Sequence, residues 1–224
     1  MSYSDYTTLN KLRHTLEISH KRQHLFIKID PVFPSRKLIE DLEEAQNCYS
    51  LLTEKAKSEF LITPILREIK RTHLDKVGVF SGVNLDIPSA GLKGFCDFIL
   101  TRTPDTIELN APICCLVEAK NRTVEEGFAQ CAAEMYAAIL FNQENQTPVE
   151  FMYGCVTNGY EWSFLRLEKK TVQIDTERLF LNQIQIILGA FKIIIDSYGQ
   201  SPSPGWIPPI PGGITTGLIT PNYG

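Results

Sequence analysis

Two stretches of the chain decide its fold, Gly94-Phe-Cys-Asp-Phe-Ile-Leu100 and Cys114-Cys-Leu-Val-Glu-Ala-Lys120. Each is a short apolar run typical of a buried strand, yet the first contains Asp97 and the second contains Glu118 and Lys120. Residues two apart on a strand share a face, so Glu118 and Lys120 point the same way from the end of a hydrophobic strand. An ionised carboxylate among apolar neighbours is costly unless it is paired or bound to a metal. The pattern therefore predicts a charged site at this end of the sheet.

The remaining sequence alternates between helical and strand patterns. Helical spacing of apolar residues covers 6–20, 38–56, 65–69, 123–142 and 177–197. Strand patterns cover 24–29, 77–87, 93–101, 113–120, 150–157, 160–167 and 171–175. Ser35 and Ser58 are predicted N-caps, and Asn158-Gly159 predicts a tight hairpin turn. This order predicts one α/β domain over residues 1–198, with a central mixed sheet flanked by helices, an N-terminal helical extension and a C-terminal helix.

Composition excludes several classes of protein. The net charge is −4, which argues against a protein that coats nucleic acid, because phosphate contacts need clustered Lys and Arg. The chain has no apolar run of roughly 18 residues and no signal-peptide pattern, so we expect a cytoplasmic protein without a membrane partner. Its six cysteines include no Cys-x-x-Cys pair, and buried reduced thiols are the expected state.

The last part of the chain has a different composition. Residues 199–224 contain six prolines, six glycines and no charged residue, but they include Trp206, Ile207 and Ile210. Such a segment cannot form a core of its own. One interpretation is simple disorder, and the other is an apolar tail that lies across its own domain or across a neighbouring subunit in a homodimer.

The order of these motifs resembles the PD-(D/E)XK superfamily of restriction-endonuclease-like nucleases. Asp97 corresponds to the first acid of the family motif, and Glu118-Ala-Lys120 corresponds to its acid and lysine. The residue before the first acid is Cys96, where the motif has Pro. The resemblance covers about residues 55–160 and implies an αβββαβ core within about 55–168.

Two further positions match the resemblance. The family carries a Glu on the helix before the strands, which falls on Glu59, and often a Gln on the helix after the third strand, which falls on Gln130. The recombination-nuclease branch continues as Gln-x-x-x-Tyr, but here the last residue is Glu134. This difference argues against that branch and leaves the superfamily resemblance in place.

The resemblance implies a metal-dependent nuclease that hydrolyses phosphodiester bonds in nucleic acid, with DNA the expected substrate. Mg²⁺ or Mn²⁺ would suit the oxygen ligands. Lys120 would orient the attacking water, and Gln130 would orient a water or contact a phosphate. The implied metal ligands are Asp97, Glu118, the main-chain carbonyl of Ala119 and Glu59.

Each motif also has an ordinary structural interpretation. A Glu-x-Lys pair on a strand is often a simple ion pair, and Asp97 could close a turn or pair with Lys93. The alternative function is therefore a catalytically inactive nuclease-fold protein that binds nucleic acid or assembles subunits. The acids embedded in apolar strands favour the enzyme, whereas the net negative charge favours the alternative.

Overall fold

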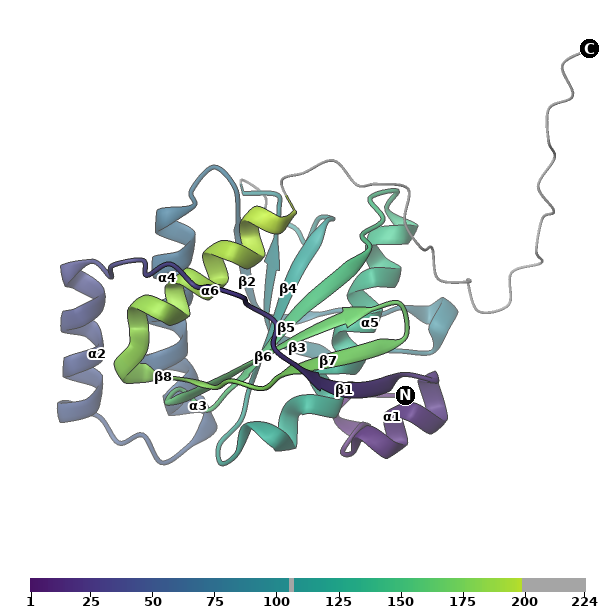
Figure 1. Cartoon of the computed structure of the whole chain (residues 1–224), viewed down its shortest axis with the longest axis horizontal. Coiled ribbons are helices and arrows are strands. Elements are labelled where there is room, and N and C mark those ends of the chain that lie inside the picture. Colours follow the sequence, from purple (N-terminus) through teal and green to yellow (C-terminus); the bar gives the residue numbers. More distant parts are fainter. Residues whose placement is uncertain (105–106, 199–224) are drawn as a thin grey trace, which may run out of the picture.

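The computed structural model describes residues 1–104 and 107–198. Its centre is a mixed sheet in the order β1-β7-β6-β5-β4-β3-β2, with β8 paired to β6 (Figure 1). The pairs β1–β7 and β4–β5 are parallel, and the other pairs are antiparallel. The strands are β1 (Ser19–Gln23), β2 (Gly78–Asn84), β3 (Phe95–Thr101), β4 (Ile113–Ala119), β5 (Phe151–Thr157), β6 (Glu161–Glu168), β7 (Thr171–Asp175) and β8 (Leu179–Phe180).

Helices cover both faces of this sheet, which confirms the predicted α/β class. On one face, α1 (Leu9–Leu16) and α5 (Phe128–Glu144) share a hydrophobic cluster with the sheet. On the other, α2 (Arg36–Cys48), α4 (Thr63–Thr72) and α6 (Ile184–Ser197) share a second cluster with it (Figure 1). Along the chain the central elements follow the order α4, β2, β3, β4, α5, β5.

Strand β4 lies between the two helical layers. All seven of its residues are buried, which explains its nearly continuous apolar sequence, because strands covered on both faces lack polar alternation. Leu116 packs into the cluster under α5, and the next residue, Val117, packs into the cluster on the opposite face. Glu118 is thus at the α5 face of the sheet, where it is buried.

The helix before β2 differs from the predicted one. Ser35 caps α2 as expected, since its Oγ accepts a hydrogen bond from the amide of Leu38 at 3.2 Å. The predicted cap at Ser58 is wrong: Thr53 caps α3 (Glu54–Lys57), which continues through a π-helical segment, Ser58–Ile62, into α4. An N-cap needs an extended backbone. Thr53 has φ −105° and ψ 153°, whereas Ser58 is already helical.

The predicted strand at 24–29 and the predicted extent of the first helix, 6–20, are also wrong. Residues 24–29 form no strand. Phe26 is buried there against Phe164, Leu25 and Ile29 are partly buried against the same cluster, and Ile27 is 99 % exposed. The apolar residues of this stretch therefore pack from an irregular segment. The strand is Ser19–Gln23 instead, whose five residues are all exposed at the edge of the sheet beside β7. Helix α1 is shorter than predicted because Glu17 ends it in the left-handed conformation, at φ 58°.

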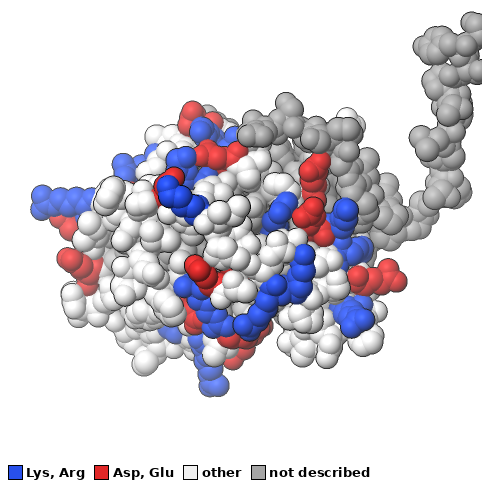
Figure 2. All heavy atoms as spheres, in the orientation of Figure 1, with Lys and Arg blue, Asp and Glu red and all other residues white. Residues whose placement is uncertain are grey.

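The C-terminal helix begins later than predicted, because β8 and a 3-10 turn (Leu181–Gln183) occupy the start of the predicted range 177–197. No helix within residues 1–104 and 107–198 has the length and apolarity that crossing a bilayer requires. The proposed apolar tail, 199–224, lies outside the described residues. Acidic and basic side chains are interspersed on the face shown in Figure 2.

Candidate active site

Asp97 joins β3 to the end of β4. The two strands are antiparallel, with Phe98 opposite Val117. Beyond this pair, Asp97 Oδ2 accepts a hydrogen bond from the main-chain amide of Ala119 at 2.8 Å. The half-buried carboxylate thereby takes the place of a main-chain partner and lies beside the carboxyl end of β4.

Glu118 and Lys120 form an ion pair at the same place. The Lys120 ammonium donates a hydrogen bond to Glu118 Oε1, and the two side chains are 16 % and 1 % exposed. The main-chain amide of Lys120 donates to the carbonyl of Thr157 at 2.8 Å, which anchors the residue beside β5. Burial lowers the pKa of Lys120, but the charge and hydrogen bond of Glu118 outweigh burial and raise that pKa above its ordinary value.

Helix α5 supplies two more polar side chains. Gln130 and Glu134 are four residues apart and therefore share one face of the helix. Gln130 Oε1 accepts a hydrogen bond from Lys120 Nζ at 3.2 Å, and Gln130 Nε2 donates to Glu134 Oε1 at 3.1 Å. Glu134 is completely buried. These contacts fix which way the Gln130 amide points, because each end has a different partner.

Burial and the charge of Asp97 outweigh the lowering effect of Lys120 and raise the pKa of Glu118 to about 7. Burial and the charge of Glu118 raise the pKa of Glu134 well above its ordinary value. The interaction between the two carboxyl groups favours ionised Glu118 and neutral Glu134. The Oε2 atom of each group is buried and has no hydrogen-bond partner within the described residues. A network of three hydrogen bonds therefore links Glu118, Lys120, Gln130 and Glu134 in that order.

The predicted residue Glu59 is not part of this hydrogen-bond network. Its side chain is 55 % exposed, on the π-helical segment, and its ion-pair partner is Lys55 at 3.8 Å. The acid from the same helical region that acts on Lys120 is Glu54, whose charge raises the pKa of Lys120. Close by, the ammonium of Lys57 donates to the carbonyl of Asn121.

The structure thus brings together five of the predicted residues and adds two. The five are Asp97, Glu118, Ala119, Lys120 and Gln130. Glu134 and Glu54 were not predicted. The sequence contains a signal for Glu134, because this acid lies inside the short apolar run Cys131-Ala-Ala-Glu-Met135. A charged residue is rarely buried in such a run without a partner.

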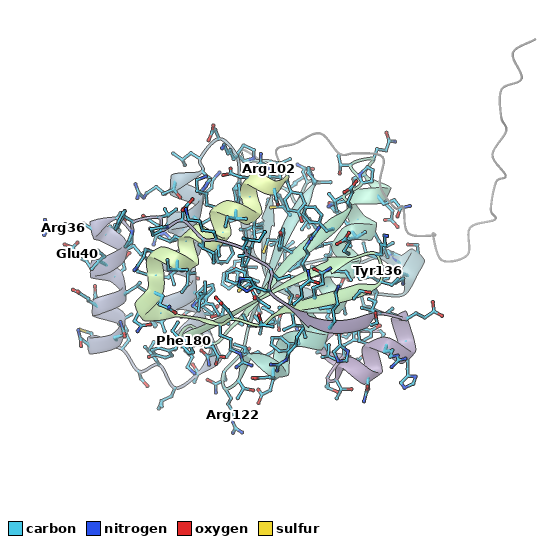
Figure 3. The ribbon with its side chains drawn as sticks, viewed as in Figure 1. Arg36, Glu40, Arg102, Arg122, Tyr136 and Phe180 are labelled. Atoms are coloured by element: carbon cyan, nitrogen blue, oxygen red, sulfur yellow. The ribbon has the colours of Figure 1, made fainter. Side chains whose placement is uncertain are left out.

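The end of the sheet that carries the site also has an exposed cation. Arg122 lies two residues beyond Lys120 and projects outward at the lower end of the molecule in Figure 3. It forms no ion pair within the part of the chain that the structure describes. The carbonyl of Arg122 accepts a hydrogen bond from Asn158 Nδ2 at 2.7 Å, which ties the loop after β4 to the β5–β6 hairpin turn.

The donors at the site are suited to a hard divalent cation. Two carboxylates and a main-chain carbonyl are oxygen ligands of the kind that Mg²⁺ and Mn²⁺ bind. The charge of Asp97 raises the pKa of both Glu118 and Glu134, and the carboxylates of Asp97 and Glu118 outnumber the single ammonium of Lys120. A cation would relieve this repulsion. In residues 1–104 and 107–198, no group of three or more His, Cys, Asp or Glu side chains is arranged to hold a metal.

Comparison with known proteins gives no assignment: no protein-family model matches the chain, and no curated protein matches its sequence.

Proposed function

We propose that this protein is a metal-dependent nuclease that hydrolyses phosphodiester bonds in DNA, and that α4–β2–β3–β4–α5–β5 is a restriction-endonuclease-like core. One observation carries the proposal. Asp97 from β3 and Glu118 and Lys120 from β4 meet at one end of a buried strand, with Gln130 of α5 in contact with the lysine. Burying charged groups costs free energy, and such groups are frequently found at functional sites.

Asp97, Glu118 and the carbonyl of Ala119 are the proposed ligands of Mg²⁺ or Mn²⁺, with water at the remaining positions. When bound, such a cation supplies Lewis acidity at the phosphate and a water of lowered pKa. Asp97 is held for this task by the amide of Ala119, and Glu118 is held by Lys120. Ligation needs ionised Glu118, so the site is expected to bind metal more tightly as the pH rises through about 7.

Lys120 is the proposed residue that orients the attacking water and neutralises charge developing on the phosphate. Its ammonium is confined from two sides, by Glu118 Oε1 and by Gln130 Oε1. A side chain restrained in this way loses little conformational entropy when it acts. Gln130 is accordingly proposed to position Lys120 by accepting its hydrogen bond.

The helical region before β2 is proposed to contribute Glu54. Its charge acts on Lys120, whereas Glu59 is exposed and paired with Lys55. Glu54 follows directly after the capping residue Thr53, so its place at the start of α3 is fixed by the cap. Replacement of Glu54 is therefore expected to impair cleavage more than replacement of Glu59.

Cleavage of labelled single- and double-stranded DNA in Mg²⁺ or Mn²⁺ tests the proposal. The wild type is expected to cut, and Asp97→Asn, Lys120→Ala and an EDTA control are expected not to. Asparagine still offers an oxygen to the amide of Ala119, so Asp97→Asn removes mainly the charge. Lys93→Ala is the matched control, because Lys93 is an exposed lysine just before β3.

Calorimetric titration with Mn²⁺ separates the remaining outcomes if no DNA is cut. Mn²⁺ binding that is lost in Asp97→Asn would mean that the site is a metal centre acting on a different substrate. Absence of binding in the wild type would contradict the proposed enzyme and leave an inactive nuclease-fold protein that binds nucleic acid or other subunits.

A further inference from the structure

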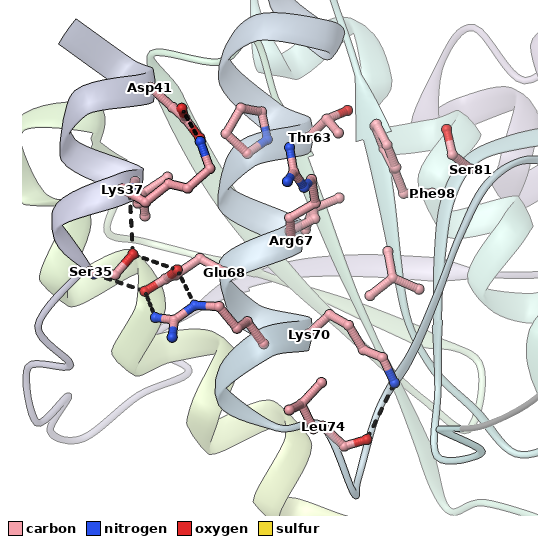
Figure 4. A pocket seen from close by; sticks show the side chains of 15 residues that line it. Ser35, Lys37, Asp41, Thr63, Arg67, Glu68, Lys70, Leu74, Ser81 and Phe98 are labelled. Carbon is pink, nitrogen blue, oxygen red and sulfur yellow. Dashed lines mark hydrogen bonds and ion pairs between the residues drawn. The ribbon is translucent and has the colours of Figure 1, made fainter.

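A groove of about 640 Å³ runs along α4, between α2 on one side and β2 on the other (Figure 4). It lies outside the candidate active site, on the face of the sheet that carries α2, α4 and α6. Most of its surface is apolar, and the apolar residues of the lining are Leu38, Pro64, Leu66, Leu74, Val79 and Phe98. An apolar groove of this volume in contact with water is costly and suits an apolar occupant.

Most cations that line this groove already have partners. Lys37 Nζ is 2.8 Å from Asp41 Oδ1, and Arg71 Nη2 is 2.8 Å from Glu68 Oε1. Lys70 Nζ donates to main-chain carbonyls, among them those of Val77 and Pro104. Carboxylates balance only two of the four cations, so the lining keeps a modest excess of positive charge.

Arg67 is the exception among these cations. It lines the groove from the exposed face of α4 (Figure 4). Its guanidinium forms no ion pair or hydrogen bond within residues 1–104 and 107–198. A guanidinium offers five N–H donors and no acceptor, so the groove presents an apolar surface with one group of free donors. An apolar segment that is rich in carbonyl acceptors matches both features.

The chain itself has such a segment close to the groove. Helix α6 ends beside the C-terminal end of α4, where Lys76 Nζ is 3.5 Å from Asp196 Oδ1. Tyr198 is held there, because its hydroxyl donates to the carbonyl of Phe151 at 3.1 Å. Leu74, two residues before Lys76, lines the groove and is 61 % exposed. The last described residue, Tyr198, therefore follows a helix end that lies near one end of the groove.

We propose that the C-terminal segment 199–224 of the same chain occupies this groove. Its 26 residues reach about 85 Å when extended, whereas α4 spans only about 14 Å from Thr63 to Thr72. The segment has no charged residue, and its six prolines lack an N–H, so carbonyl acceptors outnumber donors. Arg67 donates to those carbonyls, and apolar side chains such as Trp206 and Ile207 cover the groove lining.

Tryptophan fluorescence of the full chain tests this placement. The chain has two tryptophans, and Trp162 is completely buried in the core. The difference between the emission spectra of the wild type and of Trp206→Phe therefore reports Trp206 alone. This emission is expected to be blue-shifted relative to a synthetic peptide of residues 199–224. Leu74→Asp is expected to shift it toward the emission of the peptide.

Ile27→Asp is the matched control, because Ile27 is 99 % exposed and does not line the groove; this variant should leave the Trp206 emission unchanged. The proposal is overturned if Trp206 of the wild type emits like the free peptide, or if Leu74→Asp has no effect. It is also overturned if the blue shift is lost on dilution together with a dimer seen by sedimentation, since the segment of a second copy would then be the occupant. None of these readouts depends on nuclease activity.

Discussion

Glu118 and Glu134 are two carboxyl groups buried at one point between β4 and α5. Such a pair is tolerated because burial favours the protonated form of Glu134, and because Lys120 and Gln130 each bond to one oxygen of a carboxyl group. In a buried polar network of this kind, removal of one member leaves the next without a partner. We therefore expect Glu134 to influence the candidate site through Glu118.

The stability of the protein in EDTA is expected to fall as the pH rises from about 4.5 to 7. The pKa of Glu118 is raised from 4.5 to about 7 in the folded state, so the native protein holds a proton that the unfolded chain releases in this window. More protons bound to the native state means that unfolding becomes easier with rising pH. The loss due to Glu118 is on the order of 3 kcal/mol.

Glu134→Gln is expected to reduce the loss of stability with rising pH, because the variant has one buried carboxyl group fewer to ionise. The glutamine amide can still accept the hydrogen bond from Gln130. Urea unfolding at pH 5 and pH 8 in EDTA measures the difference. Glu126→Gln, which removes an exposed carboxylate near the start of α5, should behave like the wild type. A Glu134→Gln variant with the same pH dependence as the wild type would contradict the raised pKa of Glu134.

At the scale of elements, the start of α5 approaches the end of β4 so closely that only glycine fits. A Cβ on Gly127 would lie 2.5 Å from Val156 Cγ1 and 3.2 Å from Lys120 Cε. Val156 is completely buried in β5 and cannot move easily. The packing of this helix end is therefore what confines the stem of Lys120 from one side.

Gly127→Ala is expected to destabilise the protein by about 1–3 kcal/mol, the usual cost of overpacking a core. It is also expected to displace Lys120 and thereby lower the rate of DNA cleavage. Urea unfolding and the cleavage assay measure the two effects. Glu126→Ala, one residue earlier and exposed, should change stability by no more than about 0.5 kcal/mol. Full activity in Gly127→Ala would show that the Lys120 stem is not confined by this contact.

At the scale of the whole molecule, the N-terminal extension is part of the core. Leu12 of α1 and Ile18 are completely buried, and both belong to the cluster under α5. Strand β1 then continues the sheet beyond β7. The hydroxyl of Tyr3 donates to the carbonyl of Leu85 in the connection after β2. The extension thus supports the helix that supplies Gln130 and Glu134.

Leu12→Ala is expected to cost 2–5 kcal/mol, in the range of large-to-small substitutions of buried leucines. The free energy of unfolding in urea measures this cost. Ile27→Ala removes a side chain of similar size that is 99 % exposed, and it should be close to neutral. If Leu12→Ala were equally neutral, the N-terminal extension would be an independent attachment to the sheet.

The sequence by itself determined the α/β class, the positions of β3, β4, β5 and α5, and the candidate residues Asp97, Glu118, Lys120 and Gln130. It could do so because periodicity reports which side chains are buried, and because charged residues inside apolar strands are conspicuous. Whether these residues form a nuclease centre stays a prediction.

Only the tertiary structure decided which side chains complete the site. The cap at Thr53 and the π-helical segment Ser58–Ile62 set the rotation of the helix about its axis, and a π turn changes that phase relative to a regular helix. Glu59 consequently faces solvent while Glu54 acts on Lys120. Glu134 became a member of the site through the packing of α5 on β4. A pattern along one segment cannot specify such partners, since they depend on how two distant segments are oriented toward each other.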